Sequence, residues 1–311
     1  MKILDIPFIK SEHFRMDLRR LEMLLELSRL GSMREVSEEL AVTTSTVSQQ
    51  IAALSREVGA ELIEPDGRRV RITPAGRRLA DHAVGILAAV EAARSDLDPD
   101  AEPSGTVRVA GFATAVRRSL LPALTDLARS HPRIELRIHE HEPAEAFALL
   151  ASDDLDLALT YDFGLAPAVI DRTLRAVPLW TAPWGLAVPP AVADPELAKL
   201  PAAQVVAHFA DQDWIVNSRN SADEQVLTAL GSLADVEVRV THRADSLDLV
   251  EDFVLAGLGV GLFPEDDSGR KAVAVLPLRD PDIALCAFAV TRRGREHWPP
   301  LRAVLHRLGA T

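Results

Sequence analysis

Residues 34–54 read REVSEELAVTTSTVSQQIAAL, and this stretch decides the fold of the amino-terminal region. Its apolar residues recur at helical spacings in two groups. These groups are Val36 with Leu40, and Val47 with Ile51 and Leu54. Ala41 and Val42 lie between the two predicted helices, which therefore meet at a tight turn. Thr43 suits the N-cap of the second helix, because its hydroxyl can accept an amide proton of the first turn.

The second predicted helix carries short, uncharged hydrogen-bonding side chains away from its apolar face. The candidate DNA-contacting residues on this helix and its cap are Thr43, Thr44, Ser45, Ser48 and Gln49. Such side chains suit base edges in a major groove. An ordinary helical hairpin with a polar solvent face has the same pattern, so the pattern alone leaves both interpretations open.

A basic turn follows the hairpin. Residues 65–73 read PDGRRVRIT, in which Val70 and Ile72 alternate with polar residues as in a strand. We expect a two-stranded wing whose arginines contact DNA phosphates, namely Arg68, Arg69 and Arg71. A solvated charged hairpin is the alternative.

This region resembles the amino-terminal winged helix-turn-helix of LysR-type transcriptional regulators. The resemblance is carried by MDLRRLEMLLELSRLGSMREVSEELAVTTSTVSQQIAALSREVGAELIE and GRRVRITPAGRRL, covers residues 16 to 98 strongly, and continues by layout, most sharply at LAGLGVGLFP (255–264). The family usually begins at the position of Met16, so residues 1–15 are expected to be a flexible extension or a misassigned start. Where the family commonly has an arginine after the first wing strand, this chain has Ile63-Glu64-Pro65-Asp66, which puts one phosphate contact in doubt.

The expected fold class is a multidomain α/β protein. We expect a winged domain over 16–73, a linker helix over 74–98 and a hinge over 99–105. The apolar stripe predicted along the linker helix consists of Leu79, Ala83, Ile86, Leu87 and Val90. The resemblance implies that this helix pairs with its copy in a second subunit, and packing on its own chain is the alternative.

Strands and helices alternate after the hinge, which favours parallel sheets with covered faces. The expected lobes are lobe I, residues 106–181 and 282–311, and lobe II, residues 182–281. The resemblance implies a two-lobed effector-binding domain like that of periplasmic binding proteins.

Ligands in such sheets bind at the carboxyl ends of strands, next to helix amino-termini. The candidate effector-binding residues at these places are Phe112, Thr114, Thr160, Asn217, Ser218 and Ser246. Each of these residues could instead be a helix cap. The resemblance supports the effector role, because matching positions line the effector cleft of LysR-type regulators. Because helix amino-termini favour negative charge, we expect an anionic metabolite or an amino acid as effector.

Composition excludes several other classes. The net charge of −12 over 311 residues argues against a nonspecific polyanion binder. The single cysteine, Cys286, cannot form an internal disulfide, and we expect it to be a buried small side chain, with a redox sensor as the alternative. The chain begins with no secretory signal and has no apolar run of about 20 residues, so we expect a cytoplasmic protein without a membrane span.

Catalytic and metal-binding motifs are missing from the sequence. We find no GxSxG, P-loop, GxGxxG after a strand or HExxH, and therefore expect neither an enzyme nor a cofactor. His139 and His141 share one face of a predicted strand without an evident third ligand, so we expect no metal site.

The sequence therefore predicts a DNA-binding transcriptional regulator controlled by a small molecule. The expected partners are double-stranded DNA, the effector, a second copy in a homodimer or homotetramer, and RNA polymerase. The alternative is a cytoplasmic small-molecule binding protein whose winged domain contacts other proteins. The acidic balance of that domain favours this alternative, and a gel shift against the chain's own upstream DNA would decide between them.

Overall fold

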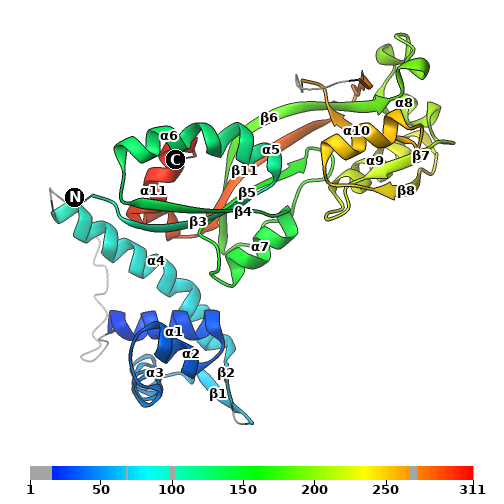
Figure 1. Cartoon of the computed structure of the whole chain (residues 1–311). Coiled ribbons are helices and arrows are strands. Elements are labelled where there is room, and N and C mark those ends of the chain that lie inside the picture. The colour runs from blue at the N-terminus through cyan, green and yellow to red at the C-terminus, as the bar shows by residue number, and fades with distance from the viewer. Residues whose placement is uncertain (1–15, 68, 99–101, 267–271, 311) are drawn as a thin grey trace, which may run out of the picture.

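The computed structural model describes residues 16–67, 69–98, 102–266 and 272–310. The extension expected over residues 1–15 lies outside these ranges, and so does Arg68. Figure 1 shows a small helical domain, a long helix that leaves it, and two further lobes placed side by side.

The small domain has the predicted winged helix-turn-helix architecture. Its elements are α1 (Leu18–Leu30), α2 (Met33–Glu39), α3 (Thr44–Val58), β1 (Ile63–Asp66) and β2 (Arg69–Ile72). The side chains of Asp17, Ser32 and Thr43 accept backbone amide protons at the starts of the three helices. Gly31 and Gly59 end α1 and α3 in the left-handed conformation, which glycine adopts without a Cβ clash.

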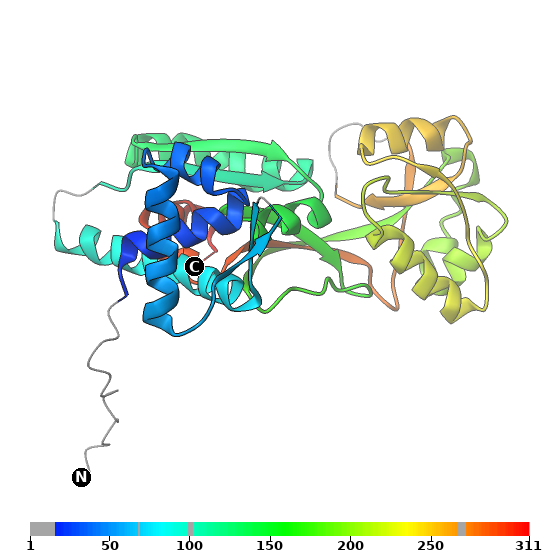
Figure 2. The ribbon, with the colours of Figure 1, turned by 90° about the horizontal axis from the view of Figure 1, so that it is seen from below.

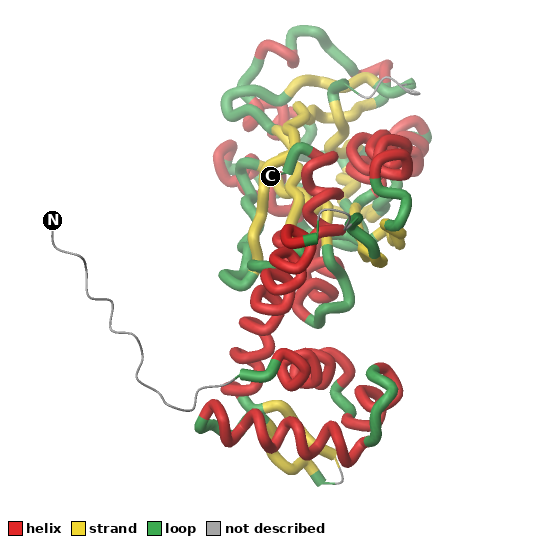
Figure 3. The backbone as a smooth tube through the Cα atoms, turned by 90° about the vertical axis from the view of Figure 1, so that its left-hand side faces the viewer, coloured by secondary structure: helices red, strands yellow, loops and turns green. Residues whose placement is uncertain are grey.

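The linker helix α4 (Pro74–Leu97) begins with Pro74 in its first turn. Thr73 caps it, because its hydroxyl accepts from the Gly76 amide at 3.0 Å and donates to the Glu61 carbonyl at 2.7 Å. In Figure 3 the helix rises from the winged domain to the lobes.

The apolar stripe predicted along α4 is divided between two surroundings. Ala83 is buried, and Leu79 and Leu87 are half-buried against the core of the winged domain. Ile86 is exposed instead, in a row that the helix continues with Ala89, Ala93 and Leu97. Part of the stripe therefore packs on its own chain, and a second, parallel row stays open to solvent.

The remaining chain builds one mixed sheet with helices on its faces. The strands are β3 (Gly105–Gly111), β4 (Ile134–Glu140), β5 (Leu157–Phe163), β6 (Leu174–Val188), β7 (Asp213–Val216), β8 (Arg239–Arg243), β9 (Val260–Pro264), β10 (Ala274–Pro277) and β11 (Ala284–Arg292). The helices are α5 (Ala113–Ala115), the π-helical η1 (Val116–Leu120), α6 (Leu121–Ser130), α7 (Pro143–Ala151), η2 (Pro190–Val192), η3 (Leu197–Lys199), α8 (Ala202–His208), α9 (Ala222–Ala234), α10 (Leu247–Leu255), η4 (Arg295–His297) and α11 (Pro299–Leu308).

The prediction of parallel sheets is confirmed within each lobe and is wrong at the centre. The strand order is β4-β3-β5-β11-β6-β9-β7-β8, with β10 paired to β6. Parallel pairing holds for β3 with β4 and β5, and for β7 with β8 and β9. The central strands β6 and β11 are antiparallel, because the chain crosses between the lobes once in each direction.

Strand β6 belongs to both lobes. It pairs with β11 from Leu174 to Pro183 and with β9 and β10 from Trp184 onward. The boundary predicted between residues 181 and 182 thus falls inside this strand, close to the change of partners.

Lobe I also packs against the linker helix. A Cβ placed on Gly294, at the start of η4, would lie 2.5 Å from the Gly85 Cα of α4, so the two backbones are in contact. Beside this contact, Arg292 donates to Asp81 of α4 at 2.8 Å and to Asp153 of lobe I at 3.1 Å. Figure 2 shows the winged domain and α4 next to lobe I, with lobe II projecting away from them.

Of the helices in the described ranges, none has the length and apolar character of a membrane span.

Candidate DNA-binding and effector-binding sites

The outer face of α3 carries the predicted polar side chains. Thr43, Thr44, Ser45, Ser48 and Gln49 are all exposed, whereas Val47, Ile51 and Leu54 are fully buried. Helical spacing therefore separates an exposed polar face from a buried packing face.

The five candidates differ in how free their side chains are. The Thr43 hydroxyl accepts from the Thr46 amide and lies 2.8 Å from the Ser45 hydroxyl. The Thr44 hydroxyl lies 3.2 Å from that of Ser37 on α2. Among the described residues, Ser48 and Gln49 have no side-chain hydrogen-bond partner and remain open to an incoming molecule.

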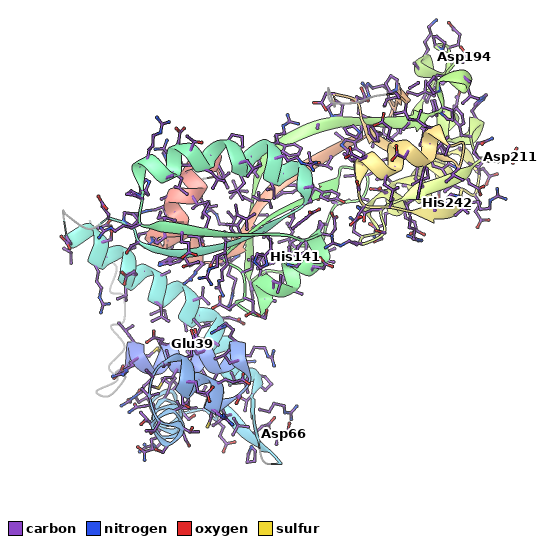
Figure 4. All side chains as sticks on the ribbon, viewed as in Figure 1. Glu39, Asp66, His141, Asp194, Asp211 and His242 are labelled. Carbon is purple, nitrogen blue, oxygen red and sulfur yellow. The ribbon has the colours of Figure 1, made fainter. Side chains whose placement is uncertain are left out.

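Of the three predicted wing arginines, the structure describes the side chain of Arg71. Arg68 and the side chain of Arg69 lie outside the described part of the structure. Arg71 is exposed, and its Nη2 lies 2.6 Å from Glu64 Oε1 across the wing. Figure 4 places Asp66 at the tip of the wing, so acidic side chains accompany the basic ones there.

A cavity of about 290 Å³ lies between the lobes. Lobe I contributes the β3–α5 turn, the end of β4, and parts of β5 and β11. Lobe II contributes β6, the end of β7, and the starts of α9 and α10. The cavity therefore occupies the crevice at the strand ends that the alternating pattern predicts.

The structure brings four of the six predicted effector residues to this cavity: Phe112, Thr114, Asn217 and Ser246. Ser218 is exposed and does not line the cavity. Thr160 is buried off the cavity wall, and its neighbour Tyr161 lines the cavity instead. Because β5 is buried on both faces, its sequence shows no alternation that would tell which side chains face the crevice.

Sequence reasoning missed a hydrogen-bond network that joins the lobes beside this cavity. Asn220 of lobe II donates to Glu142 Oε2 at 2.5 Å and to the Tyr161 hydroxyl at 2.6 Å. Tyr161 in turn donates to Glu142 Oε2 at 3.0 Å. A second bridge runs from Arg219 of lobe II to Glu145 of lobe I at 2.6 Å. Side chains such as Asn220 have no sequence signature, because only the arrangement of the two lobes brings them to their partners.

The surroundings shift the pKa values of several groups in and beside this network. Burial raises the pKa of Glu142 and raises the pKa of Asp223 to about 7. Burial, together with the Glu142 charge, raises the pKa of the Tyr161 hydroxyl well above its ordinary value. Conversely, hydrogen bonds from Arg219 and His141 lower the pKa of Glu145.

The charge of the cavity wall opposes the expected anion. The lining includes five carboxylates and, among described residues, one cationic side chain, Arg117. The prediction of an anionic effector rested on helix amino-termini, whose partial charges are small beside full carboxylate charges. An amino acid, which carries an ammonium group, remains compatible with this wall.

His139 lies on β4 and His141 follows the end of this strand. Their ring centroids are 6.1 Å apart, and Nδ1 of His141, which Figure 4 labels, lies 3.0 Å from Oε2 of Glu145 on α7. In the described residues, no group of three or more His, Cys, Asp or Glu side chains is arranged to hold a metal ion.

A larger hollow of about 950 Å³ separates the winged domain from lobe I. Its walls come from α1 and α4 on one side and from β3, β4 and η4 on the other. Arg108 and Arg295 both donate to the buried Asp156 at its edge, which lowers the pKa of that carboxyl despite its burial. We interpret this hollow as the space between two domains, because ion pairs within the chain already satisfy its buried carboxylate.

Family models match both parts of the chain. Residues 18–77 match the bacterial regulatory helix-turn-helix protein of the lysR family, and residues 100–311 match the LysR substrate binding domain. Among curated proteins, the chain is 28% identical to the hydrogen peroxide-inducible genes activator of Pectobacterium carotovorum, with 95% of each chain covered. It is 25% identical to the transcriptional dual regulator GltC of Bacillus subtilis, covering 91% of this chain and 93% of that one.

Solved structures share the fold over nearly the whole length. A full-length OxyR variant from Pseudomonas aeruginosa superposes with a TM-score of 0.68 at 20% identity, covering 95% of this chain and 94% of that one. ArgP from Mycobacterium tuberculosis gives a TM-score of 0.65 at 19% identity, covering 94% and 96%. With a helix-turn-helix domain, a two-lobed ligand-binding domain and family models that together span most of its length, this chain belongs to the LysR family of transcriptional regulators.

Proposed function

We propose that this regulator reads base edges with Ser48 and Gln49 of α3 and responds to a small molecule bound between its lobes. The observation that carries the proposal is the interlobe cavity, whose walls come from both lobes. A ligand that contacts both walls stabilises their closed arrangement by the difference of its affinities for the closed and open forms.

The DNA half of the proposal rests on the exposed face of α3. Ser48 and Gln49 have the donors and acceptors that base edges require, and no described residue competes for them. The wing and the exposed Arg77 and Arg78 at the start of α4 supply positive charge for phosphates. Membership of the family supports DNA binding over the alternative of a protein-contact module.

Two copies of the chain are needed on DNA. One winged domain reads only a few base pairs, so useful specificity requires two half-sites. We propose that the exposed row Ile86, Ala89, Ala93 and Leu97 on α4 is the pairing surface of a homodimer, or of the dimers within a homotetramer. RNA polymerase is then the expected partner at the promoter.

Small-molecule input suits this chain better than an internal redox switch. Cys286 is its one cysteine, so an intrachain disulfide cannot form. The volume of the cavity is at the lower end of the range for ligand sites, which favours a metabolite of few heavy atoms.

A gel shift with the DNA upstream of the chain's own gene tests the proposal. We expect a specific complex that an excess of unrelated DNA does not displace. Asn217→Ala should leave this complex intact and weaken the response to effector, because Asn217 lines the cavity and not the DNA face. Loss of the complex in Asn217→Ala, with the fold retained, would contradict this division of roles.

A further inference from the structure

The cavity between the lobes is lined by carboxyl groups that have few cationic partners. The lining carboxylates, contributed by both lobes, are Glu140, Glu142, Asp223, Asp245 and Asp248. Asp245 is paired with Arg219 at 3.3 Å. No ion pair joins the other four to any residue in the described ranges, and Glu142 is bonded only by the neutral groups of Tyr161 and Asn220. Burial raises the pKa of Asp223 to about 7, so this carboxyl is only partly charged near pH 7, and the full charges of the wall are those of its other carboxylates.

The arginines near the cavity do not neutralise the carboxylates that line it. Arg117 is exposed on η1 at the edge of the cavity. Arg219 is shared between Asp245 and Glu145, so it is already held by two carboxylates. Gathering like charges around a cavity costs free energy unless an opposite charge enters it.

Aromatic rings form another part of the same wall. Phe112, Tyr161 and Trp184 line the cavity, and the Phe112 and Tyr161 rings lie 4.6 Å apart at 59°. Aromatic faces attract organic cations, and their apolar surface packs against aliphatic carbon. Carboxylates next to aromatic rings are therefore suited to a cation that carries a short carbon chain.

The placement of the carboxylates argues against a bare metal ion. They come from the end of β4, from α9 and from the start of α10, and no described group of them converges on one point. An ammonium group with three donors can bond one or two carboxylates of such a wall, while a second polar group of the same molecule reaches the opposite lobe.

We propose that the effector is a small organic cation that carries a primary ammonium group on a short carbon chain. This inference rests on the proposed function of the cavity and adds the chemical class of its ligand. An alkyl diamine and a basic amino acid share this chemistry, and the amino acid would also place its carboxylate near Arg117.

Calorimetry of small molecules binding to the full-length chain tests this ligand class. The probes are 1,4-diaminobutane, L-lysine and succinate, which has nearly the length of the diamine with the opposite charge. We expect at least one amine to bind, more weakly as salt rises, and succinate not to bind. If only one of the two amines binds, the result tells whether the ligand is an alkyl diamine or a basic amino acid. Binding of succinate, or no binding of either amine at millimolar concentration, would overturn the proposal.

Two exposed carboxylates allow a variant that leaves the buried network intact. Glu140→Gln combined with Asp248→Asn should weaken amine binding roughly 2- to 30-fold, as expected for two partly exposed charge pairs. Asp211→Asn, on the outer surface of lobe II (Figure 4), is the matched control and should bind like the parent chain. Equal binding by the double variant and the control would also overturn the proposal.

A gel shift on the same preparations separates this inference from the proposed function. If the chain shifts its DNA and binds neither amine, the ligand class is wrong and DNA recognition stands. If an amine binds the cavity and leaves the DNA complex unchanged, the ligand class stands and the coupling of the cavity to DNA is wrong.

Discussion

Glu64 and Arg71 face each other across the wing, with Arg71 Nη2 2.6 Å from Glu64 Oε1. Both side chains are exposed, so the pair contributes only about 0–1 kcal/mol to folding. Its larger consequence is for DNA, because Glu64 holds a guanidinium that would otherwise be free for a phosphate.

Glu64→Gln should therefore strengthen binding to all DNA sequences and steepen the salt dependence. Each additional phosphate contact adds roughly 0.9 to the slope of log K against log salt. Glu61→Gln removes an equal charge from the same domain without touching Arg71, and serves as the control in the same titration. If Glu64→Gln and Glu61→Gln act alike, general repulsion and not the ion pair restrains the wing.

Gln49 and Gln50 offer a matched pair on α3. Gln49 is exposed without a described partner, whereas the Gln50 side chain accepts from Arg20 Nε at 2.7 Å. Gln49→Ala should weaken specific binding by about 1–3 kcal/mol and leave nonspecific binding nearly unchanged. Gln50→Ala should lower the midpoint of thermal unfolding and keep the preference for the specific site. Competition gel shifts and calorimetry measure the two effects, and equal loss of specificity in both variants would remove Gln49 from the base-reading role.

Ile86 tests the pairing surface of α4. It is exposed, so Ile86→Asp should leave each chain folded and shift the molecular mass in solution toward the monomer. Leu87→Asp is the contrasting variant, because Leu87 packs against the core of the winged domain and its replacement should destabilise the fold. Light scattering after gel filtration gives the mass. An unchanged mass for Ile86→Asp would place the pairing surface elsewhere.

The winged domain could be predicted closely because local signals decide it. Caps such as Thr43 and the spacing of Val47, Ile51 and Leu54 fix the start and the buried face of α3 within the segment itself. The π-helical η1 (Val116–Leu120) between α5 and α6 had no comparable signal. Neither had α8 and β10, short elements that form because neighbouring parts of lobe II cover them.

The candidate site was predictable only as a location. Strand ends indicated the crevice, and Phe112, Thr114, Asn217 and Ser246 line it. The carboxylates that dominate its chemistry lie on segments that the sequence gives no reason to combine. Which of the many acidic residues of an acidic chain share one wall depends on how the lobes close.

Asp223 should make the stability of the chain depend on pH. Its pKa is raised to about 7 by burial, with the Glu142 charge and the Asn217 amide also facing it. An unfolded aspartate titrates near 3.9, so the folded form holds the extra proton between about pH 4 and pH 7. The contribution of this carboxyl is therefore complete below that window and is lost as pH rises through it.

Asp223→Asn should flatten that dependence, because an amide stays neutral and still offers an oxygen to the Asn217 N–H. Urea unfolding at several values from about pH 5 to pH 8 measures it. Asp211→Asn, on an exposed carboxyl, should keep the slope of the parent chain. An equally steep slope in Asp223→Asn would assign the pH dependence to other groups.

Gly85 and Gly294 should respond unequally to the same substitution. A Cβ on Gly85 would lie 3.4 Å from Gly294 Cα, an ordinary contact, and alanine favours the helix by about 0.5–1 kcal/mol. A Cβ on Gly294 would lie 2.5 Å from Gly85 Cα, and Gly294 has a φ of +88°. Gly294→Ala should therefore destabilise by about 1–3 kcal/mol, whereas Gly85→Ala should be neutral or stabilising. Thermal unfolding compares them, and equal effects would mean that the two backbones are not in close contact.

The backbone contact between Gly85 and Gly294 lies near the middle of α4, at a point about which the helix could tilt relative to lobe I. Gly85 is 11 residues from Pro74, about 16 Å of helix. A tilt of about 10° around this point would move the Pro74 end of α4 by about 3 Å, close to the 3.4 Å rise of one base pair. A small rearrangement of lobe I at this contact would thus displace the start of α4 by a distance comparable to one base-pair step.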